Sequence, residues 1–181
     1  MKKIITLILF VIMGIFTFSE EMGQLKIGDQ LPNLKLMTLD GKIVNSDSYR
    51  GKRLFISFTA TWCPYCQPEK KIFGPIYDKA LSKENDLVVA VIFGDYGHDE
   101  KLDNPDKVKA YMKENNYKFP IFYDKGKEIA KQLGLKSVPS GILIDKNGKV
   151  IEMEHEFYKL PTFQKYAPIP PAVLAQPAEK K

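Results

Sequence analysis

The feature that most constrains this chain is a Cys-x-x-Cys motif, Cys63-Pro64-Tyr65-Cys66, between an apolar run at residues 54–58 and a helix-like stretch at residues 63–81. Two thiols at this spacing can close a disulfide across a single turn. A cysteine at the start of a helix faces backbone N–H groups and the positive end of the helix dipole, which favours the Cys63 thiolate. Because the thiolate attacks disulfides, the motif predicts thiol–disulfide exchange.

These are the only two cysteines among the 181 residues. A structural disulfide contributes more stability when it closes a longer loop, and a two-residue loop gives little, which favours a redox role. Zinc prefers four ligands, and the sequence offers only His98 and His155 to complete a site with the cysteines. We therefore expect no metal and no cofactor.

The N-terminus has the form of a secretory signal. Met1-Lys2-Lys3 precedes an apolar run at residues 4–18, which is long for a signal core and short for a spanning helix. We expect residues 1–19 to be a signal peptide cleaved after Ser19, or an uncleaved membrane anchor. Either form predicts an extracytoplasmic protein, periplasmic or in the cell envelope.

Charge excludes one class of partner. The formal net charge is +5, and it falls to +3 without residues 1–19, which carry two lysines and no acid. Lysines alternate with acidic residues, as at residues 107–114, and no dense basic block with aromatic residues occurs. We therefore predict no nucleic-acid partner.

Strand-like and helix-like segments alternate along the chain, which predicts an α/β fold with a central mixed β-sheet flanked by helices and an N-terminal β-hairpin extension. We expect a domain at residues 25–160 and a proline-rich tail at residues 161–181. The expected elements are hairpins at residues 34–44 and 141–156, strands at 54–58, 87–93 and 119–123, and helices at 63–81, 104–115 and 125–133.

With these features in place, the chain resembles the exported thioredoxin-like proteins of the TlpA and ResA type, within the redoxin group. The residues that carry the resemblance are Phe58-Thr59-Ala60-Thr61-Trp62-Cys63 with Cys66, then Glu69, Val138-Pro139, and residues 143–145 leading to 148–150. The resemblance covers roughly residues 25–157. It implies a thioredoxin-like fold in which a cis Val138–Pro139 bond faces the cysteines.

The resemblance also implies the residues that contact a substrate. The Val138 backbone would pair with an extended client segment, while Trp62 and Pro139 would wall the site. The Pro64-Tyr65 dipeptide is that of glutaredoxins. Because glutaredoxins have reduction potentials of about −200 to −230 mV and thioredoxin about −270 mV, the dipeptide predicts a milder reductant than thioredoxin.

A proton carrier for Cys66 is less obvious. Cytoplasmic thioredoxins have a buried aspartate on the strand before the motif, where this chain has Ser57. The resemblance offers Asp95, after the next strand, and Glu69, three residues beyond Cys66. Asp95 follows Gly94 and is equally readable as a turn residue, and Glu69 as a solvated or charge-paired helix residue.

The partners implied by the resemblance are disulfide-containing client proteins, such as apocytochrome c or a methionine sulfoxide reductase, and a membrane thiol reductase that supplies electrons. Two alternatives stay open. A copper-binding or metal-delivery module would use both cysteines and one histidine, although related copper proteins space their cysteines by three residues. A thiol peroxidase would need proline and threonine where this chain has Ile56 and Ala60.

Overall fold

The computed structural model describes residues 24–71, 73, 86–96 and 102–154. The expected signal or anchor at residues 1–19 and the tail at 161–181 lie outside these ranges, as do His98, His155 and, within the expected helix at 63–81, residues 72 and 74–81. In the described ranges, no helix is both long and apolar enough to cross a membrane.

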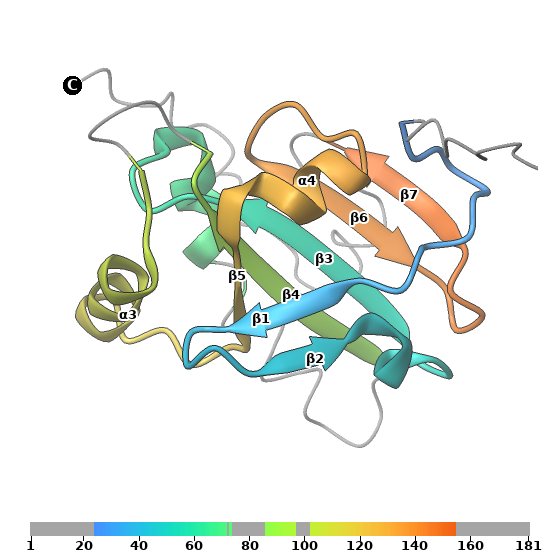
Figure 1. Ribbon diagram of the computed structural model, residues 1–181, viewed down its shortest axis with the longest axis horizontal. Helices are drawn as coiled ribbons and strands as arrows, with labels where there is room; N and C mark the ends of the chain where they lie inside the picture. Colours follow the sequence, from blue (N-terminus) through green and yellow to red (C-terminus); the bar gives the residue numbers. More distant parts are fainter. Residues whose placement is uncertain (1–23, 72, 74–85, 97–101, 155–181) are drawn as a thin grey trace, which may run out of the picture.

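A single mixed sheet of seven strands forms the centre of the fold, in the order β2-β1-β5-β4-β3-β6-β7 (Figure 1). Strands β3, β4 and β5 are parallel, and the remaining neighbours pair antiparallel. This arrangement confirms the predicted fold class and both hairpins. The strands are β1 (Lys35–Thr38), β2 (Ile43–Asn45), β3 (Arg53–Thr59), β4 (Leu87–Gly94), β5 (Ile121–Asp124), β6 (Ser140–Ile144) and β7 (Val150–Glu154).

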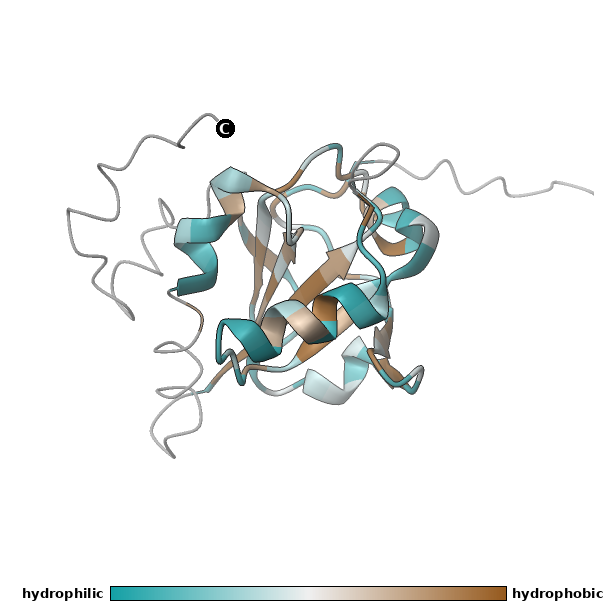
Figure 2. Cartoon of the chain, turned by 90° about the vertical axis from the view of Figure 1, so that its left-hand side faces the viewer, coloured by the Kyte–Doolittle hydropathy of each residue, from teal (hydrophilic) through white to brown (hydrophobic). Residues whose placement is uncertain are grey.

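Successive side chains of a strand point to opposite faces of the sheet, and each face is covered by its own apolar core. On β3, Phe55 belongs to one apolar core, together with Phe73 and residues of β4 and α3 (Pro105–Glu114). Its neighbour Ile56 belongs to the second core, beneath α4 (Glu128–Gln132). Figure 2 shows the apolar strands enclosed by the hydrophilic outer faces of the helices.

Helix α3 begins where its sequence predicts. Asn104 caps it by accepting a hydrogen bond from the Lys107 amide at 2.9 Å, and Pro105 occupies the first helical position, where no N–H is needed. Val108 and Met112, one turn apart, are its buried residues.

The expected continuous helix at residues 125–133 is wrong. A 3-10 turn, η4 (Lys125–Lys127), precedes α4, and both Gly126 (φ 68°) and Lys127 (φ 61°) adopt left-handed backbone conformations. Glycine enters this region without a steric cost, so the chain can turn there. The helix proper therefore starts only at Glu128.

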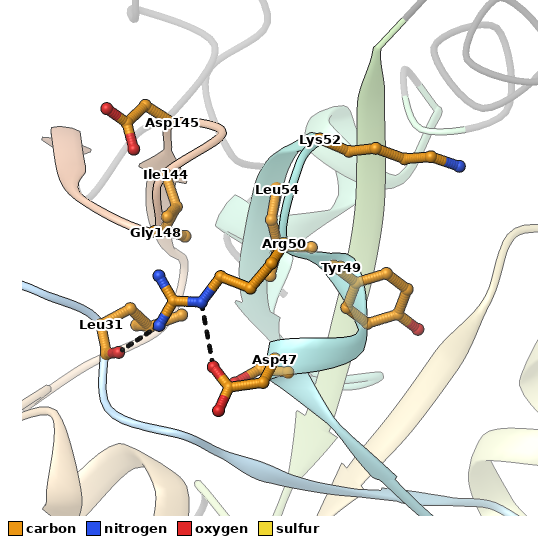
Figure 3. Close-up of a pocket in the computed structure, with 10 residues that line it drawn as sticks. Leu31, Asp47, Tyr49, Arg50, Lys52, Leu54, Ile144, Asp145 and Gly148 are labelled. Atoms are coloured by element: carbon orange, nitrogen blue, oxygen red, sulfur yellow. Dashed lines mark hydrogen bonds and ion pairs between the residues drawn. The ribbon is translucent and has the colours of Figure 1, made fainter.

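Arg50 joins three segments at the edge of the sheet where β3 begins (Figure 3). It follows the 3-10 turn η1 (Ser46–Tyr49) and pairs with Asp47, with 3.0 Å between Nε and Oδ1. Its other nitrogens donate to the carbonyl oxygens of Asn147 (2.5 Å) and Leu31 (3.4 Å). The β6–β7 turn is thereby tied to the segment before β1.

The topology also fixes where a site can form. The parallel strands β3, β4 and β5 end at the same edge of the sheet. The cysteine motif follows β3, Asp95 follows β4, and Asp124 is the last residue of β5. The edge that holds Arg50 is the opposite one, so the small pocket of Figure 3 lies far from the cysteines.

Candidate active site

Cys63 and Cys66 form a disulfide, with 5.3 Å between their Cα atoms. Cys63 is still extended (φ −77°, ψ 114°), and the chain then makes a 3-10 turn, η2 (Pro64–Cys66), before the helix begins at residue 67. The expected helix start at Cys63 is thus four residues too early. Pro68 lies in the first turn of the helix, where it removes no intrahelical hydrogen bond.

The two cysteines are both buried and differ slightly in exposure. Cys63 is 3% exposed, whereas Cys66 is fully buried. Both pack against Ala60, with Trp62 and Val138 alongside. Of the two, Cys63 therefore keeps the small exposed area.

The loop before β6 approaches the reactive cysteine. The Val138–Pro139 bond is cis, as the resemblance implies, and the Val138 carbonyl oxygen lies 4.0 Å from Cys63 Sγ. Pro139 itself is buried, while Val138 is half-buried. The Val138 backbone is thus the main-chain segment beside Cys63.

The residues between the cysteines face solvent. Pro64 is exposed and Tyr65 is 61% exposed, which is unusual for a large aromatic side chain. Trp62 is half-buried against the cysteines. Aromatic surface beside a reactive sulfur suits contact with a client.

Glu69 and Asp95 differ in their surroundings. Glu69 is fully buried, so its reading as a solvated residue is wrong. It follows Cys66 by three residues on one helix, the spacing that brings side chains to the same face. Asp95 is held on both oxygens, by the Tyr123 hydroxyl at 2.5 Å and the Gly126 amide at 3.0 Å.

A buried lysine lies behind the motif, and the sequence interpretation missed it. Lys70 is fully buried, and its Nζ donates to the Ala60 carbonyl oxygen at 2.6 Å. The same ammonium lies 4.6 Å from the centre of the Tyr111 ring and 5.7 Å from that of Phe93. Burial lowers the pKa of Lys70 to about 7, against the opposing charges of Asp103 and Glu69.

Asp103 holds the next residue of the same turn. Its carboxylate accepts the Thr61 amide at 2.8 Å and the Thr61 hydroxyl at 2.5 Å. The Thr61 carbonyl accepts Gln67 Nε2 at 3.0 Å, and the Gln67 amide oxygen accepts the Tyr111 hydroxyl at 2.7 Å. Together with Lys70, these bonds fix the turn that joins β3 to Cys63.

One signal in the sequence could have revealed Lys70. Residues three or four apart share a helix face, and Lys70 follows Cys66 by four residues and precedes Phe73 by three. The periodicity therefore places a lysine on the buried face. Asp103 carried no such signal, because its role depends on a contact with a residue 42 positions away.

For metals, the described ranges contain no group of three or more His, Cys, Asp and Glu side chains that could hold an ion. The one histidine that a copper site would add to the cysteines would be His98 or His155, and both lie outside those ranges.

This fold and this cysteine pair define the class of thioredoxin-like thiol–disulfide oxidoreductases. The Redoxin family profile matches residues 26–167, and the chain belongs to that family. It is similar to thiol-disulfide oxidoreductase ResA of Bacillus thuringiensis subsp. konkukian, 34% identical over 140 residues that cover 77% of this chain and 73% of the relative. Thioredoxin-like protein YneN of Bacillus subtilis is 30% identical over 134 residues, or 74% of each chain.

Solved structures agree on the fold. A candidate protein disulfide isomerase from Bacteroides thetaiotaomicron has a TM-score of 0.64 and 27% identity, covering 80% of this chain and 91% of that one. StoA from Bacillus subtilis has a TM-score of 0.57 and 21% identity, covering 68% and 87%. At that identity the second likeness shows the fold alone. With its Redoxin match and its ResA relatives, the protein is a thiol–disulfide oxidoreductase.

Proposed function

We propose that this protein works outside the cytoplasm and reduces disulfides in client proteins. The observation that carries the proposal is the Cys63–Cys66 disulfide at the end of β3, with Cys63 the more accessible sulfur and the Val138 backbone beside it. The apolar run at residues 4–18, read as a signal or anchor at residues 1–19, supports the location. Residues 25–160 form the catalytic domain in this proposal, and residues 161–181 a tail.

The reaction begins with the dithiol form. The Cys63 thiolate attacks one sulfur of the client disulfide, and the other client sulfur leaves as a thiolate. Cys66 then attacks Cys63 Sγ, which restores the Cys63–Cys66 disulfide and releases the second client sulfur. Two electrons pass from the protein to the client.

The Cys66 thiol must lose its proton for the second step. Glu69 is our first candidate acceptor, because it is buried on the same helix one turn from Cys66. Asp95 is the second candidate acceptor. It ranks below Glu69 because both of its oxygens already accept hydrogen bonds, from Tyr123 and Gly126. Trp62, Pro64, Tyr65, Val138 and Pro139 form the client-contacting surface.

A membrane thiol reductase returns the protein to its dithiol form in this proposal. The client class follows the resemblance, which suggests apocytochrome c or a methionine sulfoxide reductase.

Trapping tests the assignment of the two cysteines. Cys66→Ser should accumulate a mixed disulfide between Cys63 and a client, visible by mass spectrometry, while Cys63→Ser should reduce no disulfide. Labelling of Cys66 before Cys63 by an alkylating reagent at mildly acidic pH would reverse the two roles.

The reduction potential tests the direction. A value near the glutaredoxin range of about −200 to −230 mV supports a reductant, as the Pro64-Tyr65 dipeptide predicts. A value near about −120 mV, the potential of a strong oxidant, would contradict the proposal.

A further inference from the structure

A groove starts beside the reactive cysteine and runs away from it over α4. Val138, whose carbonyl oxygen is 4.0 Å from Cys63 Sγ, lines its near end. Its apolar lining consists of side chains from β3, α4 and the loop before β6, namely Phe58, Ala130, Leu135 and Val138. Its empty space, which includes the open mouth, is about 420 Å³.

Ring packing and hydrogen bonds hold the floor of the groove in place. Phe58 packs against Tyr96 in an edge-to-face contact with 6.3 Å between ring centres. The Tyr96 hydroxyl donates to Asp124 at 3.0 Å, and the same carboxylate accepts the amides of Ile129 and Ala130 at the start of α4. The Asp124 carboxylate is therefore buried and already engaged.

The rim of the groove is basic. Lys127, Lys131 and Lys136 line it, from η4, α4 and the loop before Val138, and in the part of the chain that the structure describes no carboxylate lines it. Among the described residues, none of these lysines forms an ion pair. Residues 125–138 hold four lysines and one carboxylate, Glu128, for a net formal charge of +3.

We propose that this groove, which we call the lysine-rimmed groove, selects clients whose redox-active disulfide is flanked by an acidic segment. Apolar side chains of the segment would fill the floor, and its carboxylates would face Lys127, Lys131 and Lys136. Charge complementarity at an interface raises the association rate and selects among partners, so the groove sets which disulfides reach Cys63. The inference rests on the proposed disulfide reduction and names its substrate class.

Two synthetic peptide disulfides test the selection. They are identical except that three residues beside one cysteine are glutamates in the first and lysines in the second. Rates of reduction by the full-length dithiol protein are measured by stopped flow. Each rate is divided by the rate with hydroxyethyl disulfide, which is small and uncharged and so reports on the cysteines without the groove.

At low salt, we expect the glutamate peptide to react at least tenfold faster than the lysine peptide. Tenfold is the lower end of the range for electrostatic steering. The preference should shrink between about 0.01 M and about 1 M salt, as the Debye length falls from about 30 Å to about 3 Å. This salt test needs no variant, so it does not depend on how a mutant folds. The triple variant Lys127→Glu, Lys131→Glu, Lys136→Glu should reverse the preference.

A matched control changes the same number of charges elsewhere. Lys42, Lys52 and Lys149 are exposed and lie at the opposite edge of the sheet, so their replacement by glutamate should leave the peptide preference unchanged. An equal loss of preference in both triple variants would show that overall charge, not the groove, decides.

The remaining outcomes separate the two proposals. Equal rates for both peptides, with hydroxyethyl disulfide still reduced, would overturn the lysine-rimmed groove and leave disulfide reduction standing. Failure to reduce all three disulfides would overturn the proposed function itself, and the groove proposal with it.

Discussion

Lys70 Nζ lies 2.6 Å from the Ala60 carbonyl oxygen, which places a buried ammonium directly behind the turn that leads to Cys63. Ala60 packs against both cysteines, so the contact joins the helix that follows Cys66 to the strand that precedes Cys63. The Tyr111 ring face and the charges of Asp103 and Glu69 offset part of the cost of burying this charge.

Lys70→Met should flatten the dependence of stability on pH. The pKa of Lys70 is lowered by burial from its usual 10.5 to about 7 in the folded protein, so the unfolded chain binds this proton more tightly between those values. In the wild type, the free energy of unfolding should therefore rise with pH from about 7 to about 9.5, by at most about 1.4 kcal/mol per pH unit. The Lys70→Met variant should lack this rise. Urea unfolding of the oxidised protein measures the slope.

The groups around Lys70 do not add to this slope. Burial raises the pKa of Tyr111 above its usual value, so its hydroxyl stays neutral across this window. Titration of the N-terminal amine is common to both proteins and cancels in the comparison. Parallel curves for wild type and Lys70→Met would show that the ammonium of Lys70 does not titrate in this window.

Asp103→Asn should destabilise the protein by about 1.5–3 kcal/mol, the range for hydrogen bonds to a charged group. The change removes the charge that holds the Thr61 amide and hydroxyl. The control is Asp106→Asn, at an exposed position in the first turn of α3, which should shift stability by less than about 0.5 kcal/mol. Equal losses of stability in the two variants would show that the hydrogen bonds from Asp103 to Thr61 contribute no more than an exposed carboxylate does.

The strands and the two hairpins could be predicted because their signals are local. Neighbouring residues alone are enough to recognise the apolar run of β4 and the Asp40-Gly41 turn between β1 and β2. Asn104-Pro105 likewise marks the start of α3, because cap chemistry involves only neighbours in the chain.

The kink before α4 shows where local signals stop. Residues 125–133 have helical composition, but Lys127 adopts a left-handed conformation that composition does not indicate. One Asp95 oxygen accepts the Gly126 amide, and the Asp124 carboxylate accepts the two amides at the start of α4. Contacts from the ends of two strands thus decide its geometry.

The candidate site also contains residues that local motifs predict and residues that only distant contacts explain. The cysteines and Val138–Pro139 are marked by motifs, whereas the burial of Lys70 depends on Tyr111 and Asp103, which come from another part of the chain. A charged residue on a helix is ordinarily solvated, so its charge alone predicts the wrong environment.

Arg50→Ala should lower stability without changing the chemistry. Arg50 ties the carbonyl oxygens of Asn147 and Leu31 together, but the side chain is 37% exposed, so we expect a loss of about 1 kcal/mol. Because Arg50 lies at the edge opposite the cysteines, the rate with hydroxyethyl disulfide should equal that of wild type. If the variant reduced hydroxyethyl disulfide more slowly than wild type at a temperature where it is still folded, Arg50 would affect the chemistry and the prediction would be wrong.

Glu69→Gln should slow the second chemical step while leaving the first intact. Removing a general base typically costs about 10²–10⁴-fold, and Glu69 is the buried carboxylate one helical turn from Cys66. Attack by Cys63 precedes this proton transfer, so formation of the mixed disulfide should keep its wild-type rate. Stopped-flow traces at neutral pH, with the mixed disulfide resolved by rapid quench, separate the two steps.

Asp95→Asn is the matched comparison, since it also replaces a carboxylate by its amide. Both Asp95 oxygens already bind Tyr123 and Gly126, so we expect this variant to lose stability and to resolve the mixed disulfide faster than Glu69→Gln does. Slower resolution in Asp95→Asn would move the proton acceptor to Asp95. Wild-type resolution in both variants between about pH 6 and pH 8 would exclude both carboxylates and leave the proton to water or to the departing client thiolate, whose basicity suits it to accept.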